Sequence, residues 1–142
     1  SRAFGCLQAK ARLFVGWGEM KKNALRKFLG IYHLIQDDVK EERTETVIQL
    51  YGRKKKICIP EWFFKIEDVF QQILSVDENE IVKEIIEKVY RKGADDKVLL
   101  SGLPVTESGY YRLKRKLEGK IYELYIVRGD VTQDEILSNK LL

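Results

Sequence analysis

The stretch LLSGLPVTESGYYRLKRKLEGKIYELYIV, residues 99–127, joins a short apolar segment to a long basic one through a Gly-Leu-Pro-Val corner. Thr106 follows the corner and is a suitable N-cap, because its hydroxyl can accept a hydrogen bond from a free amide of the next turn. Apolar residues then recur at three- and four-residue steps, which predicts an amphipathic helix over 106–126. The residues expected to face inward are Tyr110, Leu113, Leu117, Ile121 and Leu124.

The order of a short helix over 94–101, a tight corner and a long basic helix predicts a helix-turn-helix over 94–126. In that motif the first turns of the second helix face base edges in the major groove of DNA. Arginine can donate two hydrogen bonds to guanine, while lysine and tyrosine reach phosphates. The residues predicted to bind DNA are Thr106, Glu107, Ser108, Tyr111, Arg112, Lys114, Arg115 and Lys120.

The remaining sequence predicts a mainly α-helical protein. Apolar stripes at helical spacing run from Met20 to about Arg43, over 61–76 and over 77–92. Asp77 is a candidate N-cap, with Glu80 three residues later, as in a capping box. The single histidine, His33, lies one position off the first stripe, so we expect it at the surface.

The segment 46–59 is rich in β-branched and aromatic residues and contains a Gly-Arg-Lys corner, which is typical of a short β-hairpin. We therefore divide the chain into an N-terminal helix and hairpin, 20–60, and a helical DNA-binding domain, 61–142. Met20 is the only methionine, and residues 1–19 are interpreted as a leader or added segment outside the fold. A capping box at 132–135 predicts a short last helix.

Charge is segregated along the chain: residues 20–60 carry a net +5, residues 61–96 a net −5 and residues 97–120 a net +4. Charge that is segregated in this way suits a protein that presents one face to a phosphate backbone. No apolar run approaches the roughly 20 residues of a membrane span. We therefore expect no membrane partner. Cys6 and Cys58 have no metal-binding or redox spacing, which favours a cytoplasmic protein with reduced thiols.

The segment Leu-Pro-Val-Thr-Glu-Ser-Gly-Tyr-Tyr-Arg-Leu-Lys-Arg-Lys-Leu, residues 103–117, resembles the carboxy-terminal signature of the ArpU/RinA-type late-gene regulators of Gram-positive phages. In that family a short corner, Ser or Thr, an aromatic-Tyr-Arg triplet and basic residues close a helix-turn-helix similar to region four of sigma factors. The resemblance implies a sequence-specific transcription activator of phage or prophage genes that binds double-stranded DNA, without cofactor or catalytic centre.

The residues also bear on three other functions. An enzyme is not expected, because pairs such as Asp37-Asp38 and Asp95-Asp96 have no His, Lys or Ser at a catalytic spacing. A DNA-packaging component similar to a phage small terminase subunit would form ring-like homo-oligomers. A module that docks on RNA polymerase or a sigma factor would use the acidic helices within 61–96 and bind little DNA by itself. No cofactor and no metal ion is expected for any of the non-enzymatic functions.

Overall fold

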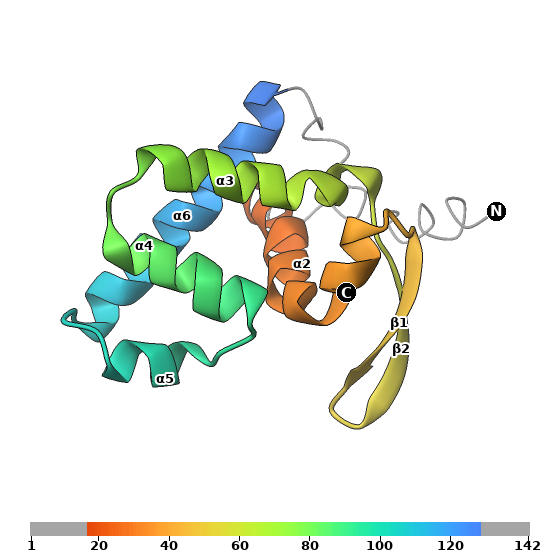
Figure 1. The fold of residues 1–142 in the computed structure, drawn as a ribbon, viewed down its shortest axis with the longest axis horizontal. Helices are drawn as coiled ribbons and strands as arrows, with labels where there is room; N and C mark the ends of the chain where they lie inside the picture. Colours follow the sequence, from red (N-terminus) through yellow and green to blue (C-terminus); the bar gives the residue numbers. More distant parts are fainter. Residues whose placement is uncertain (1–16, 129–142) are drawn as a thin grey trace.

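The computed structural model describes residues 17–128, with side chains from residue 24 onward, and it is mainly helical with one small β-hairpin, as the sequence predicts. Figure 1 shows the arrangement of these elements. In chain order they are α2 (Trp17–Lys40), β1 (Glu45–Leu50), β2 (Arg53–Cys58), η2 (Glu61–Lys65), α3 (Ile66–Val76), α4 (Glu80–Glu84), η3 (Ile85–Arg91), α5 (Asp96–Ser101) and α6 (Glu107–Arg128).

The core forms where α2 and α6 meet the helices from the middle of the chain. Helix α6 contacts α2, α3 and α4, and in Figure 1 it runs diagonally behind α3 and α4. Aromatic rings fill the centre: the Phe28 and Phe63 centroids are 5.4 Å apart, and those of Trp62 and Tyr125 are 5.3 Å apart. Rings at such separations add to the stability that burial of their apolar area already provides.

One hydrophobic core runs from Ala24 to Tyr125, so the first helix and the later helices pack together. The division of the chain at residue 60 stays a prediction about its organisation. Helix α2 begins at Trp17, and the interpretation of residues 1–19 as a leader or added segment stays a prediction. Residues 1–16 and the helix expected from 132 lie outside the described residues.

The loop before α4 differs from the predicted capping box. The Asp77 carboxylate accepts a hydrogen bond from the Asn79 amide at 2.9 Å, and the Asn79 side chain accepts one from the Ile81 amide at 2.8 Å. Asn79 is therefore the N-cap, and α4 begins at Glu80. Asp77 instead closes the turn before the helix, which is a role that Asp side chains commonly take in turns.

The segment η3 is a π-helix that continues α4, and Gly93 lies just beyond its end with a φ of +76°. A Cβ at Gly93 would lie 2.4 Å from Cδ2 of His33, so α2 approaches the backbone here more closely than any larger residue allows. His33 is half-buried against this glycine. The expectation of a surface histidine is wrong, because the absent side chain at Gly93 makes room for the ring.

The two strands pair antiparallel, with Leu50 opposite Arg53, and are joined by the two residues Tyr51 and Gly52. Both turn residues have positive φ, 51° and 77°, as in a type I′ turn. The hairpin prediction is confirmed, but its turn lies earlier than the expected Gly-Arg-Lys corner. Arg53 and Lys54 belong to β2.

Cys58, the last residue of β2, is disulfide-bonded. The expectation of reduced thiols is therefore wrong at this position. Among the described residues, no helix has both the length and the apolar character that a membrane crossing requires.

Candidate nucleic-acid interface

The segments α5, the corner at 102–106 and α6 follow each other in the order that the sequence predicts. Helix α5 starts at the N-cap Asp95, whose side chain accepts a hydrogen bond from the Lys97 amide at 2.8 Å. The hydroxyl of Thr106 accepts a hydrogen bond from the Gly109 amide at 3.1 Å, so the predicted N-cap of α6 is confirmed. These two caps fix where each helix begins.

Asp96 in the first turn of α5 holds two residues of α6. One carboxylate oxygen accepts a hydrogen bond from the Tyr110 hydroxyl at 2.5 Å, and the other lies 2.6 Å from Nζ of Lys114. The side chains of Lys114 and Asp96 are only 19% and 22% exposed, so water screens this ion pair less than a surface pair. We call these three residues the Asp96 clamp. It fixes the orientation of α6 relative to α5.

The polar network continues to α2 and η3 through Glu118, a buried carboxylate that is 7% exposed. Its oxygens accept hydrogen bonds from Nε of Arg26 at 2.9 Å and from the Tyr90 hydroxyl at 3.1 Å. Sequence reasoning missed Glu118. The available signal was its place four residues after Lys114 and beside Leu117, on the inward side of the predicted helix.

Burial of these tyrosine rings alters their titration. Burial and the Glu118 carboxylate beside the hydroxyl raise the pKa of Tyr90 well above its ordinary value. Burial and the hydrogen bond to Asp96 likewise raise the pKa of Tyr110. The buried tyrosines therefore donate hydrogen bonds as neutral hydroxyls at neutral pH.

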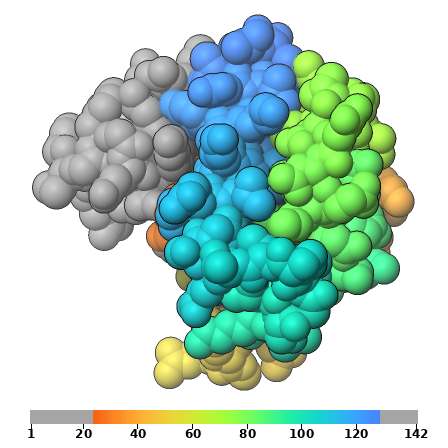
Figure 2. Space-filling model, turned by 90° about the vertical axis from the view of Figure 1, so that its left-hand side faces the viewer, coloured from red at the N-terminus to blue at the C-terminus, as the bar shows by residue number. Residues whose placement is uncertain are grey.

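The outward side of α6 carries a row of residues at four-, three- and four-residue steps, which we call the outward stripe: Ser108, Arg112, Arg115 and Gly119. The side chains of Ser108, Arg112 and Arg115 are exposed. Neither arginine forms an ion pair or a side-chain hydrogen bond with any residue of the described part of the chain. Figure 2 shows α6 at the surface over much of its length, beside α3 and α4.

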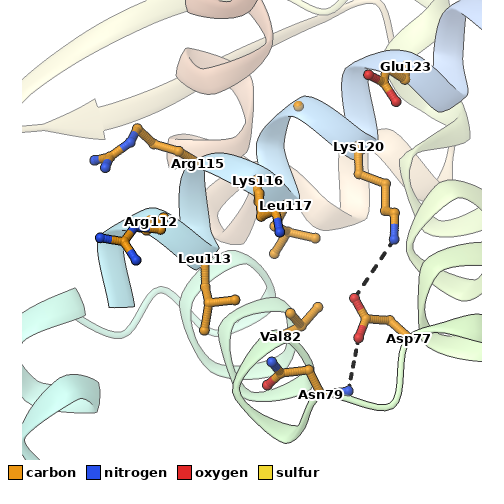
Figure 3. Close-up of a pocket in the computed structure, with 11 residues that line it drawn as sticks. Asp77, Asn79, Val82, Arg112, Leu113, Arg115, Lys116, Leu117, Lys120 and Glu123 are labelled. Carbon is orange, nitrogen blue, oxygen red and sulfur yellow. Dashed lines mark hydrogen bonds and ion pairs between the residues drawn. The ribbon is translucent and has the colours of Figure 1, made fainter. Parts of the chain in front are cut away.

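A groove with a volume of about 740 Å³ runs beside the outward stripe, between α6 and the start of α4. Figure 3 shows Arg112 and Arg115 directed away from Val82 and Asp77, while Lys120 is directed toward Asp77. The Nζ of Lys120 lies 4.0 Å from an Asp77 oxygen. The stripe thus offers cations to the outside, whereas the groove has mixed charge.

The structure separates the predicted DNA-binding residues into two groups. Glu107, Ser108, Arg112 and Arg115 are exposed near the start of α6. Lys114 differs from the expectation of an outward side chain, because Asp96 draws it back against α5. Tyr111 is half-buried, with its ring centroid 5.1 Å from that of Tyr110. Thr106 caps the helix and Lys120 faces Asp77.

No cluster of three or more His, Cys, Asp or Glu side chains that could hold a metal ion occurs among residues 17–128. Comparison of the chain with protein-family models, with curated proteins and with solved structures finds no match.

Proposed function

We propose that this chain is a sequence-specific transcription regulator that binds double-stranded DNA through the outward stripe of α6. The observation that carries the proposal is the contrast within four consecutive residues. Lys114 is held by Asp96, while Arg112 and Arg115, on either side of it, are exposed and form no ion pair with the described residues. The helix is thus fixed in place and its arginines remain available to a partner.

Two arginines three residues apart lie on one helix face, where like charges repel by a few tenths of a kcal/mol. An anionic partner would remove that cost. A guanidinium also presents donors in a planar fork that matches the two acceptors of guanine in the major groove. Because the Asp96 clamp fixes α6 before binding, less conformational freedom is lost when the arginines meet base edges.

The resemblance to phage late-gene regulators and the segregated charge of the chain support the same function. They favour an activator type encoded by a phage or prophage, without a catalytic centre. In this proposal RNA polymerase would face the exposed acidic residues of 61–96 that do not border the outward stripe, where phosphates would repel them least. A second copy of the chain would supply a second α6, as most helix-turn-helix proteins bind as dimers.

The test is selection of bound duplexes from a pool of random sequence, followed by affinity measurements on the enriched sequence. Changing Arg112 or Arg115 to alanine should cost about 1–3 kcal/mol of binding free energy each and relax the preference at one base pair. The matched control removes two exposed lysines from α2 and η2, Lys40→Ala/Lys65→Ala, and should retain the sequence preference.

Enrichment of no sequence would contradict the proposal and favour a module that docks on RNA polymerase without binding DNA. Binding of duplexes only by ring-shaped oligomers, without sequence preference, would favour a packaging component. An Arg112→Ala/Arg115→Ala variant that retains full affinity for the enriched sequence would show that α6 is not the recognition helix.

A further inference from the structure

The hairpin β1–β2 projects from the helical body, and in Figures 1 and 2 its tip extends past the helices at the end of the molecule where α5 lies. Its base is firmly attached. Ile48 and Ile57 are buried in the core, and the Thr46 hydroxyl donates a hydrogen bond to Asp38 of α2 at 2.7 Å. A two-stranded ribbon is only marginally stable alone, so this attachment is what holds the tip away from the body.

The tip carries a feature that works against stability. Tyr51 is 100% exposed and has a φ of 51°, in the left-handed region. The first position of a type I′ turn favours Asn or Gly, and a bulky residue there is strained. An aromatic ring at this position buries no surface within the described protein, so folding alone gives no reason for it.

The cations beside the tip have no compensating charge. On the paired strand, Arg53, Lys54 and Lys55 lie opposite Leu50, Gln49 and Ile48, which carry no charge. All three cations are exposed and form no ion pair with a residue among 17–128. By contrast Lys56, the next residue, lies 2.9 Å from Glu45. Three adjacent like charges on one strand repel each other, and lysine is itself depleted in strands.

We infer that the tip of this ribbon is a second surface for duplex DNA, with Arg53, Lys54 and Lys55 against phosphates and Tyr51 against the sugar edge. The inference rests on the proposed function, since both surfaces take the same ligand. A two-stranded ribbon has the width that the major groove admits, and phosphate contacts position a protein without reading sequence. The ribbon therefore adds affinity, and α6 adds specificity.

Duplex DNA fits these residues better than the other polyanions. Proteins that bind single strands offer several aromatic rings on which successive bases stack, whereas this tip has one. A membrane anchor would need a larger apolar surface than one tyrosine among three cations. Arg53 and Lys55 lie on one face of the ribbon and Lys54 on the other, so a ribbon in the major groove can offer cations to the phosphates on both sides of the groove.

The inference is tested by fluorescence anisotropy with a labelled random-sequence duplex of about three helical turns. The affinity is measured as salt increases, for the full chain and for Lys54→Gln/Lys55→Gln. A plot of log K against log salt has a negative slope, and loss of two phosphate contacts should make it less steep by about 2. The matched control Lys40→Gln/Lys65→Gln makes the same charge change on α2 and η2 and should leave the slope unchanged.

Tyr51→Asn provides a variant that we expect to fold at least as well as the unchanged chain. It places the favoured Asn-Gly pair in the turn, so the hairpin should become more stable to urea while the affinity for the duplex falls. A variant that is more stable and binds as tightly as the unchanged chain would contradict a role for the ring.

Failure of this inference can be told apart from failure of the proposed function. Suppose that Arg112→Ala/Arg115→Ala loses the sequence preference while Lys54→Gln/Lys55→Gln keeps the full salt slope. The ribbon is then not a DNA surface, and the assignment of α6 as the recognition helix is retained. If only the ribbon variant shows altered binding, the ribbon is a DNA surface and α6 is not the recognition helix. No binding of any duplex overturns both. Tighter binding to a single-stranded oligonucleotide, or to phosphatidylglycerol vesicles, overturns the choice of duplex DNA.

Discussion

Asp96 and Lys114 form an ion pair at 2.6 Å across the corner between α5 and α6, and neither side chain is more than about a fifth exposed. The same carboxylate accepts a hydrogen bond from the Tyr110 hydroxyl. In the corner itself Gly102 and Pro104 are exposed, while Leu103 and Val105 pack against the core. The Asp96 carboxylate thus adds two polar contacts to the apolar packing that places α6 against α2, α3 and α4.

The first prediction concerns the strength of this ion pair. In a double-mutant cycle, Asp96→Ala and Lys114→Ala should show a coupling of about 1 kcal/mol or more in the free energy of unfolding, because the pair is largely shielded from water. Urea unfolding of both single variants and the double variant measures the coupling. Lys116→Ala, at an exposed position without a partner in the described chain, is the control. Additive effects of Asp96→Ala and Lys114→Ala would contradict the clamp.

A second prediction separates two glycines of α6. At Gly119 a Cβ would meet nothing within 4 Å, so Gly119→Ala should stabilise the protein by about 1 kcal/mol, the difference in helix propensity. At Gly109 a Cβ would lie 2.9 Å from Oγ1 of Thr106, so Gly109→Ala should disturb the N-cap and lower stability. Thermal unfolding followed by circular dichroism distinguishes the two variants. Equal shifts of the unfolding midpoint in the same direction would contradict the prediction.

Glu118 provides a third prediction. Glu118→Ala would leave the buried Tyr90 hydroxyl without its acceptor and should destabilise the protein by about 2–4 kcal/mol. The control is Glu123→Ala on the exposed side of the same helix, which should change stability by less than about 0.5 kcal/mol. Denaturant unfolding gives both values. A Glu118→Ala variant as stable as Glu123→Ala would mean that the network contributes nothing.

The fourth prediction is a loss of stability in alkaline solution. The pKa values of Tyr32, Tyr90 and Tyr110 are all raised in the folded protein, chiefly by burial. Above about pH 10 the unfolded chain releases these protons while the folded chain retains them, so the unfolded state binds fewer protons and the free energy of unfolding falls as pH rises. Below about pH 10 their contribution is fully present.

Urea unfolding across this range, with tyrosinate absorption as a second signal, measures the effect. Tyr110→Phe should reduce the steepness of the fall, because one proton fewer is released on unfolding. Ionisation of all tyrosines at a pH where the helical circular dichroism is unchanged would contradict the assignment of buried hydroxyls.

Much of the fold could be predicted because it depends on local signals. Apolar spacing indicated the helices, and Thr106 marked the start of α6 correctly because its hydroxyl needs only the next turn. The hairpin was recognisable from its β-branched residues, but its turn was not. A tyrosine before Gly52 is an unusual turn residue, and the lysines that follow read as a loop while they in fact belong to β2.

The remaining features depend on contacts between distant residues. Lys114 and Arg115 are adjacent and both cationic, and only the position of Asp96, 18 residues earlier, makes one inward and leaves the other exposed. His33 was expected at the surface because the space beside Gly93 is invisible in a helical pattern. Glu118 is matched by partners 92 and 28 residues away, Arg26 and Tyr90.

The π-helical segment η3 makes the number of residues before Gly93 as important as their kind. Each residue turns a helix by about 100°, and a π segment accommodates an extra residue without an extra turn. Tyr90 reaches Glu118 on one side and Arg91 reaches Glu67 on another, and both directions are set by that count. Removal of a single residue from 85–89 would relax the segment toward an ordinary helix while keeping its composition. Both side chains would then swing away from their carboxylates, so chain length in this segment acts as a constraint that substitution alone cannot reveal.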